Sequence, residues 1–141
     1  MPNIVTNLAK ETMISAVSGS DLKIALLNGI ASSGTEEDLK NFGAWSDLSA
    51  YEITGEGYDP GGVTLSGTSA YSVSADEKAY FNGSSITWPD STISTYGYAL
   101  YRSTSGLVVN ITAFNSPLPK TSTNGPFTMS WDNNRILQMI G

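Results

Sequence analysis

The sequence of 141 residues contains no cysteine and no histidine. Their absence excludes Ser-His-Asp and Cys-His nucleophilic catalysis, thiol redox chemistry, and zinc sites built on imidazole or thiolate ligands. Carboxylate chemistry is the enzymatic chemistry that remains. Without cysteine the fold is also indifferent to redox conditions, so the sequence is compatible with a location inside or outside a cell.

Charged residues are scarce as well, at 14% of the chain, and acidic ones prevail. The chain has 7 Lys and Arg against 13 Asp and Glu, for a net charge of -6, and no two basic residues are adjacent. Binding to nucleic-acid phosphates needs clustered Lys and Arg, so no nucleic-acid partner is expected. No apolar run approaches the ~18 residues of a membrane span, and the first nine residues lack the charged and apolar regions of a secretory signal. We therefore expect a soluble, unprocessed protein without a membrane partner.

The residues that are plentiful, Ser, Thr and Gly, are typical of strands joined by many turns. About nine strands, spaced at roughly 8–12 residues, predict an all-β, single-domain antiparallel β-sandwich. A jelly-roll-like topology is favoured, with an immunoglobulin-like one as the alternative. The sandwich is expected over residues 21–141, preceded by an N-terminal arm or first strand over residues 1–20, in which Thr12–Ser18 is a candidate strand.

Alternation of apolar and polar residues gives the clearest strand predictions. It predicts a strand over Asp21–Asn28, a hairpin over residues 71–81 with its turn at Asp76-Glu77, and a strand over Leu107–Phe114. The run Ile93–Tyr101 is apolar on both faces, which predicts a strand buried between two layers and paired antiparallel with Leu107–Phe114.

Prolines predict where strands end, and one segment is predicted to be a helix instead of a strand. A strand containing Ile86 and Trp88 is expected to end at Pro89, and the three prolines of Asn115–Pro126 predict an exposed loop without regular hydrogen bonds. At most one short helix is expected, near residues 36–42, with Thr35 as its N-cap.

The acidic residues allow two kinds of site. A glycosidase needs two facing carboxylic acids, for which the sequence offers Glu52, Glu56, Asp59, Asp76, Glu77 and Asp90. A calcium site could be built from Glu52, Glu56 and Asp59 with backbone carbonyls of the same Gly-rich turn, although their spacing does not match an EF-hand. Because these acids fall at turns and strand ends, where they serve solubility and turn geometry, we assign no catalytic, cofactor-binding or metal-binding residue.

The three tryptophans, together with seven tyrosines, allow a sugar-binding platform, since stacked aromatic rings give affinity without charge. Trp88 and Trp131 alternate with polar residues in predicted strands, so both are expected in the core. Trp45 follows Gly43 at a predicted helix-to-loop junction, where it is free to cover a core or an interface.

Four segments, in order, resemble a family of small structural proteins of tailed bacteriophages. The first is a K-x-A-L-L strand starting at Lys23, and the second is an E-x-x-G-x-G-Y-x-x-G-G segment starting at Glu52. A T-W-x-x-S-T-I turn follows at Thr87, and a G-x-F-T-I-x-W strand at Gly125, in which Met129 stands in place of the usual Ile. The resemblance covers roughly residues 21–140.

The resemblance implies a non-enzymatic virion protein, made in the host cytoplasm and located on the capsid surface. It implies a capsid cement or decoration protein that binds across subunits of the major capsid protein as a homo-oligomer, a dimer or trimer. Head-tail neck and minor tail components belong to the same family, and a glycan-binding module is a second alternative. The expected contact residues lie in the N-terminal arm, around the end of the candidate helix and in the Pro-rich loop: Ile4, Val5, Leu8, Phe42, Trp45, Pro117, Leu118 and Pro119.

Overall fold

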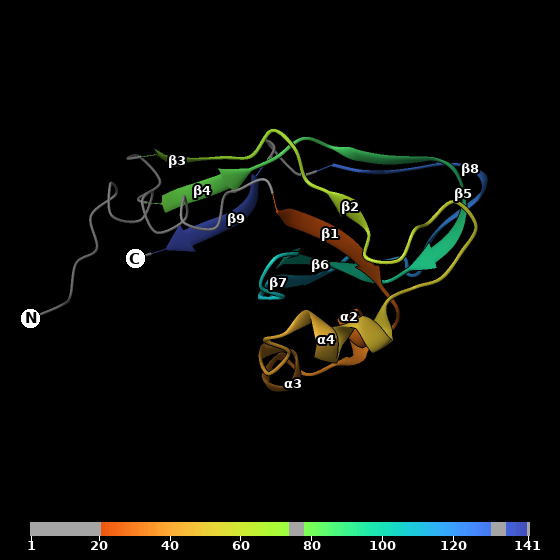
Figure 1. Cartoon of the computed structure of the whole chain (residues 1–141), viewed down its shortest axis with the longest axis horizontal. Coiled ribbons are helices and arrows are strands. Elements are labelled where there is room, and N and C mark those ends of the chain that lie inside the picture. The colour runs from red at the N-terminus through yellow and green to blue at the C-terminus, as the bar shows by residue number, and fades with distance from the viewer. Residues whose placement is uncertain (1–20, 74–77, 131–134, 141) are drawn as a thin grey trace, which may run out of the picture. The chain divides into compact units, whose positions relative to one another are not determined.

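The computed structural model describes residues 21–73, 78–130 and 135–140, which form antiparallel sheets and a few short helices (Figure 1). The all-β prediction is confirmed. The described chain falls into two compact units whose segments alternate in the sequence. The larger unit is built from residues 21–64 and 86–128, and the smaller unit contains residues 65–85 and the described residues from 129 onward.

A four-stranded sheet is the centre of the larger unit. Its order is β2 (Val63–Thr64), β1 (Leu22–Leu27), β6 (Gly97–Arg102) and β7 (Val108–Ala113), and all neighbours are antiparallel. The predicted strand at residues 21–28 and the antiparallel pairing of β6 with β7 are thereby confirmed. Nearly every side chain of β1 and β6 is buried, because both faces of this sheet are covered.

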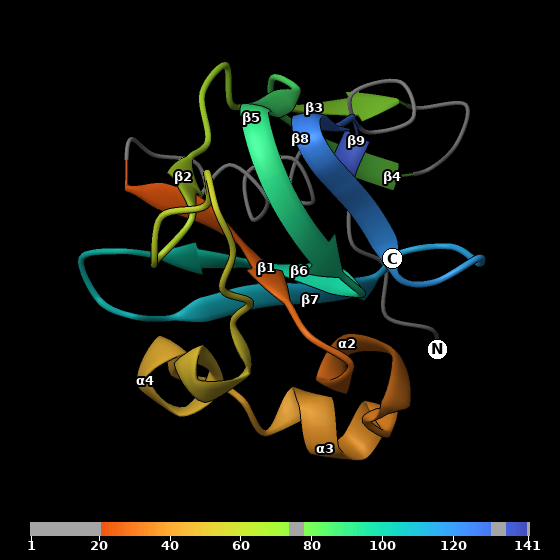
Figure 2. The same cartoon turned by 90° about the vertical axis from the view of Figure 1, so that its right-hand side faces the viewer.

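A two-stranded ribbon of β5 (Ile86–Thr95) and β8 (Lys120–Met129) crosses one face of the four-stranded sheet (Figure 2). Aromatic rings fill the space between the two layers. The ring of Phe127 lies 6.0 Å from that of Trp88 and 6.4 Å from that of Phe114, which is in turn 5.9 Å from Tyr98. Trp88 is buried, as predicted, and the packing of two sheets face to face fits the expected sandwich.

Short helices cover the other face of the four-stranded sheet (Figure 2). They are α2 (Ile30–Ser33), α3 (Glu36–Lys40) and α4 (Trp45–Leu48), followed by a 3-10 turn at Ser49–Tyr51. Thr35 caps α3 as predicted, accepting a hydrogen bond from the backbone N–H of Asp38 at 3.1 Å. No helix in the described part of the chain is long and apolar enough to cross a membrane.

The predicted short helix near residues 36–42 is present as α3, but the expectation of at most one helix was wrong. Helices α2 and α4 have four residues each and no side-chain cap, so they leave no recognisable periodic pattern in the sequence. They are held by tertiary packing instead, because Ala31 and Leu48 form one buried cluster with Leu27 and Ala99 of the sheet.

The predicted strand end at Pro89 and the predicted loop over residues 115–126 were also wrong. Strand β5 runs on through Pro89 to Thr95, and β8 begins at Lys120 inside the predicted loop and includes Pro126. Each of these strands has one partner in the described chain, so a proline without an N–H can be accommodated at the free edge. The predicted single strand over residues 93–101 is instead divided at Tyr96, where the chain turns from the ribbon into β6.

The smaller unit holds a three-stranded sheet of β3 (Ser69–Val73), β4 (Lys78–Asn82) and β9 (Arg135–Ile140), with β4 in the middle. Ser69 pairs with Asn82 and Lys78 with Ile140, which confirms the predicted hairpin over residues 71–81. Trp131 lies outside the described residues. The choice between jelly-roll-like and immunoglobulin-like topology, and the assignment of residues 21–141 to one domain, stay predictions.

Candidate functional site

The segment from Glu52 to Gly62 carries most of the acids considered for chemistry, and the structure shows what its first acid does. The carboxylate of Glu52 accepts a hydrogen bond from the Tyr58 hydroxyl at 2.5 Å and two from the backbone N–H of Gly61, at 2.8 and 3.1 Å. The Tyr58 hydroxyl also accepts a hydrogen bond from the backbone of Leu26 at 2.9 Å. Glu52 therefore ties the segment to itself and, through Tyr58, to β1.

The ionisation of Tyr58 is adapted to this role. Burial of the ring, followed by the hydrogen bond to Glu52, raises the pKa of Tyr58 well above its ordinary value. The phenol consequently remains protonated and keeps donating to the carboxylate. The neighbouring Tyr101 hydroxyl donates to the Gly61 carbonyl at 2.6 Å, and burial raises its pKa as well.

Two glycines of the same segment allow the backbone to lie directly on neighbouring strands. Gly57 has φ = 81° and Gly62 has φ = 78°, a conformation that L side chains rarely adopt. A Cβ on Gly57 would overlap the carbonyl oxygen of Asp90 in β5, and one on Gly62 would overlap that of Ile24 in β1. The glycine pattern of this segment thus serves close packing of backbone on backbone.

The candidate acids differ in their contacts. Glu52 is occupied by three hydrogen bonds, whereas Glu56, Asp59 and Asp90 are exposed. Within residues 21–73, 78–130 and 135–140, no group of three acidic side chains is arranged to hold a metal ion. Asp76 and Glu77 lie outside the described residues. The segment is best understood as a structural clamp between β1 and β5.

A hollow along β7 is the strongest candidate for a binding surface in the larger unit. It has a volume of about 580 Å³ and lies between Ala31, Leu39 and Phe42 on the helical side and Val109, Ile111 and Ala113 on the strand. We call this hollow the edge groove. Lys40 and Asn110 line it as well, so the groove offers both apolar and polar groups to a polypeptide partner.

Phe42 joins the edge groove to a second hollow. Its half-buried ring packs edge to face on Tyr51, with ring centres 5.5 Å apart. The second hollow, of about 410 Å³, lies between Phe42, Ile30, Asp38 and Tyr51. Phe42, a predicted contact residue, thus lines both hollows.

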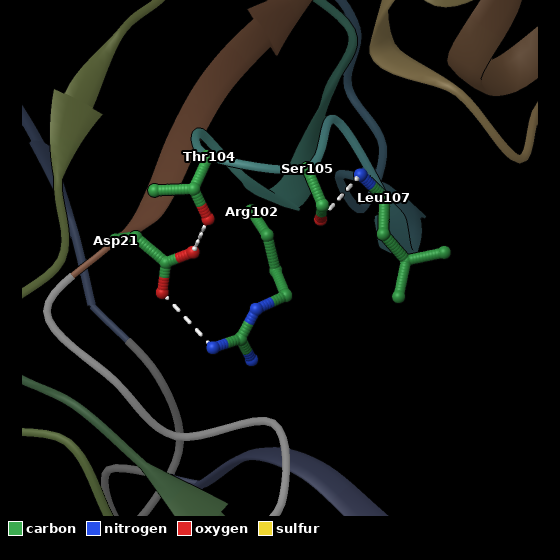
Figure 3. A network of polar contacts seen from close by, with 5 residues as sticks. All are labelled: Asp21, Arg102, Thr104, Ser105 and Leu107. Carbon is green, nitrogen blue, oxygen red and sulfur yellow. Dashed lines mark hydrogen bonds and ion pairs between the residues drawn. The ribbon is translucent and has the colours of Figure 1, made fainter.

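The turn between β6 and β7 is held by a network of polar contacts. The carboxylate of Asp21 accepts hydrogen bonds from Thr104 at 2.6 Å and from the Arg102 guanidinium at 3.0 Å (Figure 3). The hydrogen bond from Thr104, with a smaller contribution from Arg102, lowers the pKa of Asp21. The side chain of Leu107 points away from this network and is 51% exposed.

The other predicted contact residues are spread over the molecule. Trp45 stacks on Tyr101 with the rings nearly parallel and 4.3 Å apart, so one face of its indole is covered. In the β7–β8 connection, Pro117 and Pro119 are exposed and Leu118 is half-buried. The N-terminal residues Ile4, Val5 and Leu8 lie outside the described part of the chain. The structure therefore brings Phe42, but not the Pro-rich loop, to the edge groove.

The sequence did not indicate that residues of β7 would line the edge groove. The alternation of Val109, Ile111 and Ala113 with polar residues predicted a strand, yet it carried no signal that this strand would lie at the edge of its sheet. Leu107 was predicted as the first residue of this strand, but β7 begins at Val108 and Leu107 forms an isolated bridge with Ala44.

Searches of protein-family models, of curated proteins and of solved structures found no match to this chain.

Proposed function

We propose that the chain is a non-enzymatic virion structural protein of a tailed bacteriophage, acting as a capsid cement or decoration protein. It binds across subunits of the major capsid protein and stabilises the expanded head. The observation that carries the proposal is the edge groove, an open hollow with a mixed apolar and polar lining along β7, the last strand of its sheet in the described chain. Such a surface suits contact with another polypeptide, and cementing needs contact rather than catalysis.

One further observation supports a binding role. The motif that begins at Glu52, one of the four that resemble phage structural proteins, acts as a clamp that holds β1 and β5 together. A rigid body of this kind can bridge two or more capsid subunits, and each additional contact then adds avidity. A dimer or trimer of such bodies, placed on a local symmetry axis, would straddle matching subunits.

The neck or minor tail position is the alternative, and it uses the same kind of contact surface. A glycan-binding module is the second alternative, for which the half-buried Trp45 is the residue to test. Loss of glycan binding in Trp45→Ala would favour that module, and no binding to a broad glycan panel would count against it.

The deciding experiment is the copy number of the chain in the virion that contains it, measured by quantitative mass spectrometry against the major capsid protein. Cement predicts on the order of hundreds of copies, whereas a ring at the neck or tail predicts about six to twelve. Absence from the virion would overturn both structural functions.

The site is tested by adding the protein back to particles that lack it. Leu107→Ser changes an exposed side chain beside the groove, and Thr87→Ser changes an exposed side chain on the ribbon as the control. The proposal expects at least a ten-fold loss of particle binding for Leu107→Ser and none for Thr87→Ser. Equal binding by both variants would show that the edge groove does not contact the capsid.

A further inference from the structure

Three Asn-Gly pairs occur in the chain, at Asn28, Asn82 and Asn124, and their surroundings differ. In such a pair the glycine nitrogen can attack the carbonyl carbon of the asparagine side chain, because glycine has no side chain to hinder the approach. The attack forms a five-membered imide, and hydrolysis of the imide leaves aspartate or isoaspartate in place of asparagine. The reaction needs a glycine N–H without another partner, an exposed asparagine, and room for the ring.

Asn28 meets all three requirements. It is exposed, and it lies between the end of β1 and the start of α2. Within the described chain no acceptor receives the Gly29 N–H, whereas the N–H of Asn28 donates to the Tyr51 carbonyl and that of Ala31 donates to the Asn28 carbonyl. A Cβ on Gly29 would meet no atom within 4 Å, so the imide ring has room beside this peptide.

A hydrogen bond also prepares the side chain of Asn28 for the attack. Its carbonyl oxygen, Oδ1, accepts a hydrogen bond from the backbone N–H of Ile30 at 3.0 Å. This bond folds the side chain over the intervening Gly29 peptide, as in other turns that an asparagine side chain closes. It also places a donor at the oxygen that becomes negative when the nitrogen adds to the carbonyl carbon, and such a donor lowers the barrier to that step.

The other two pairs are held by their strands. Asn82 lies in β4, the middle strand of its sheet, and Gly83 after it is buried. Asn124 lies in β8, where its backbone N–H donates to the Thr92 hydroxyl at 3.0 Å. Ring closure requires rotation of the asparagine backbone, which these contacts oppose. The structure therefore favours the reaction at Asn28 over the reaction at either of the other pairs.

We propose that Asn28 is a site of spontaneous modification, at which water converts the asparagine to aspartate and isoaspartate. The Gly29 nitrogen forms a bond to Cγ of Asn28 while its proton passes to hydroxide. The side-chain NH2 group takes up a proton from water, which restores the hydroxide, and leaves as ammonia. Water then opens the imide at one of its two carbonyl groups. The chemistry requires no partner, so this proposal does not rest on the proposed function.

Isoaspartate at this position alters the start of α2. The main chain then runs through the former side chain, which lengthens the connection from β1 to α2 by a methylene group and removes from the backbone the carbonyl that accepts from Ala31. Helix α2 places Ile30 in the second hollow and Ala31 in the edge groove, and Ala31 also packs in the buried cluster with Leu48. The modification therefore weakens the packing of α2 and changes both hollows.

Peptide mapping of the full-length protein, incubated at mildly alkaline pH, tests the proposal. Mass spectrometry measures the acid formed at each Asn-Gly pair, and isotopically labelled water marks the acid that forms during the incubation. In the folded protein Asn28 is expected to react at least ten-fold faster than Asn82 or Asn124, whereas in urea the three rates converge. Equal rates in the folded protein would overturn the proposal.

Gly29→Ala is the matched variant, because its methyl group hinders the attacking nitrogen and meets no neighbouring atom. It is expected to slow the reaction at Asn28 at least ten-fold. The rates at Asn82 and Asn124 should not change, and they serve as internal controls in the same molecule. An unchanged rate at Asn28 would show that the Gly29 nitrogen is not the attacking group.

Urea denaturation of the incubated protein tests the effect on α2. Wild-type protein enriched in isoaspartate is expected to unfold at a lower urea concentration than fresh protein, whereas incubated Gly29→Ala keeps its midpoint. Fresh Asn28→Asp carries the aspartate product without the longer main chain and retains an oxygen for the Ile30 N–H, so it should unfold near the wild-type midpoint. An unchanged midpoint in the isoaspartate-enriched protein would contradict the effect on α2.

Discussion

At the scale of single residues, the carboxylate of Glu52 is the anchor of a loop that connects two sheets of the larger unit. It receives hydrogen bonds from a side chain and from a backbone N–H nine residues away, and the Tyr58 hydroxyl passes the connection on to β1. Hydrogen bonds to a charged group are among the stronger ones in proteins. The loop is thus fixed by one acid whose position in the sequence gave no sign of this function.

Glu52→Gln is expected to lower the free energy of unfolding by about 2 kcal/mol, because the neutral amide gives weaker hydrogen bonds to the same donors. Urea denaturation measures the change. Glu56→Gln, which alters an exposed acid of the same segment, should change it by less than about 0.5 kcal/mol. Equal effects of the two substitutions would contradict the anchoring role.

Gly62→Ala is expected to destabilise the protein by about 3 kcal/mol or more, because the new methyl group overlaps the Ile24 carbonyl at a positive φ. Gly29→Ala is the matched control. Gly29 has φ = -56°, and a Cβ there meets no atom within 4 Å, so this change should be neutral or stabilise by up to about 1 kcal/mol. Thermal unfolding of both variants compares them, and a tolerated Gly62→Ala would disprove the packing argument.

The lowered pKa of Asp21 predicts that the stability of the folded protein depends on pH in the acidic range. Thr104 and Arg102 lower its pKa in the folded state, so folding is favoured by the ionised carboxylate at pH values above about 3.9, the usual pKa of an unfolded Asp. This stabilisation is lost as the pH falls through the lowered pKa of the folded state. Asp21→Asn should unfold more readily than the wild type at neutral pH, with the difference shrinking towards pH ~2.

Urea midpoints measured across this pH range test the prediction. Asp59→Asn, which removes an exposed carboxylate outside the network, controls for the loss of one negative charge. A difference between wild type and Asp21→Asn that is constant with pH would show that titration of Asp21 is not its source.

At the scale of elements, the ribbon of β5 and β8 depends on hydroxyl groups as much as on aromatic packing. Ser91 is buried, and its hydroxyl contacts the Ser122 hydroxyl at 2.8 Å and donates to the Gly125 carbonyl at 3.1 Å. Thr87 and Thr128 form a similar pair at 3.0 Å near the end of the ribbon. Cross-strand pairs of this kind stabilise a ribbon that has few neighbours.

Ser91→Ala is expected to cost about 1–2 kcal/mol, because Ser122 and the Gly125 carbonyl lose a partner in a partly buried place. Amide hydrogen exchange should accelerate in β5 and β8 more than in β1 and β6. Ser94→Ala, at an exposed position of the same strand, should leave exchange unchanged. Uniform acceleration throughout both sheets would show that the ribbon does not open separately.

The extent to which these elements could be predicted depends on where their stability originates. Strands β1 and β7 and the β3–β4 hairpin were predictable because their alternation is a local pattern, and Thr35 was predictable because capping is local. Strands β5 and β8 contain Pro89 and Pro126, which argue locally against a strand. The free edges that accommodate these prolines are a property of the tertiary structure.

The candidate site follows the same rule. Phe42 was identified from its sequence neighbourhood, but the edge groove combines residues near 40 with residues near 110, and no local signal joins them. The role of Glu52 was hidden for the same reason, since its connection to β1 runs through the Tyr58 hydroxyl. Local patterns therefore singled out Phe42 and Glu52 as residues of interest, but they did not predict which residues these side chains contact.

At the scale of the whole molecule, contacts between distant parts of the sequence predominate. Leu22 pairs with Arg102, Lys23 with Thr64, and Lys78 with Ile140. Each pairing closes a long loop before it gains stability, and such topologies fold slowly.

We expect refolding from urea with time constants of about milliseconds to seconds, slower than helical proteins of similar length. Stopped-flow fluorescence of the buried Trp88 and the stacked Trp45 follows the reaction. Refolding in microseconds would mean that the distant pairings do not limit the rate.

The alternation of the two units along the chain has a consequence for biosynthesis. Strand β1 is made early, yet its long partner β6 starts at Gly97, and the larger unit needs residues up to 128. At about 5–20 residues per second, the apolar segment LKIALL waits several seconds on the ribosome before it can pair. The larger unit is finished only when residue 128 has emerged, so a product terminated before that point contains neither unit complete and leaves the apolar strand β1 without all of its partners.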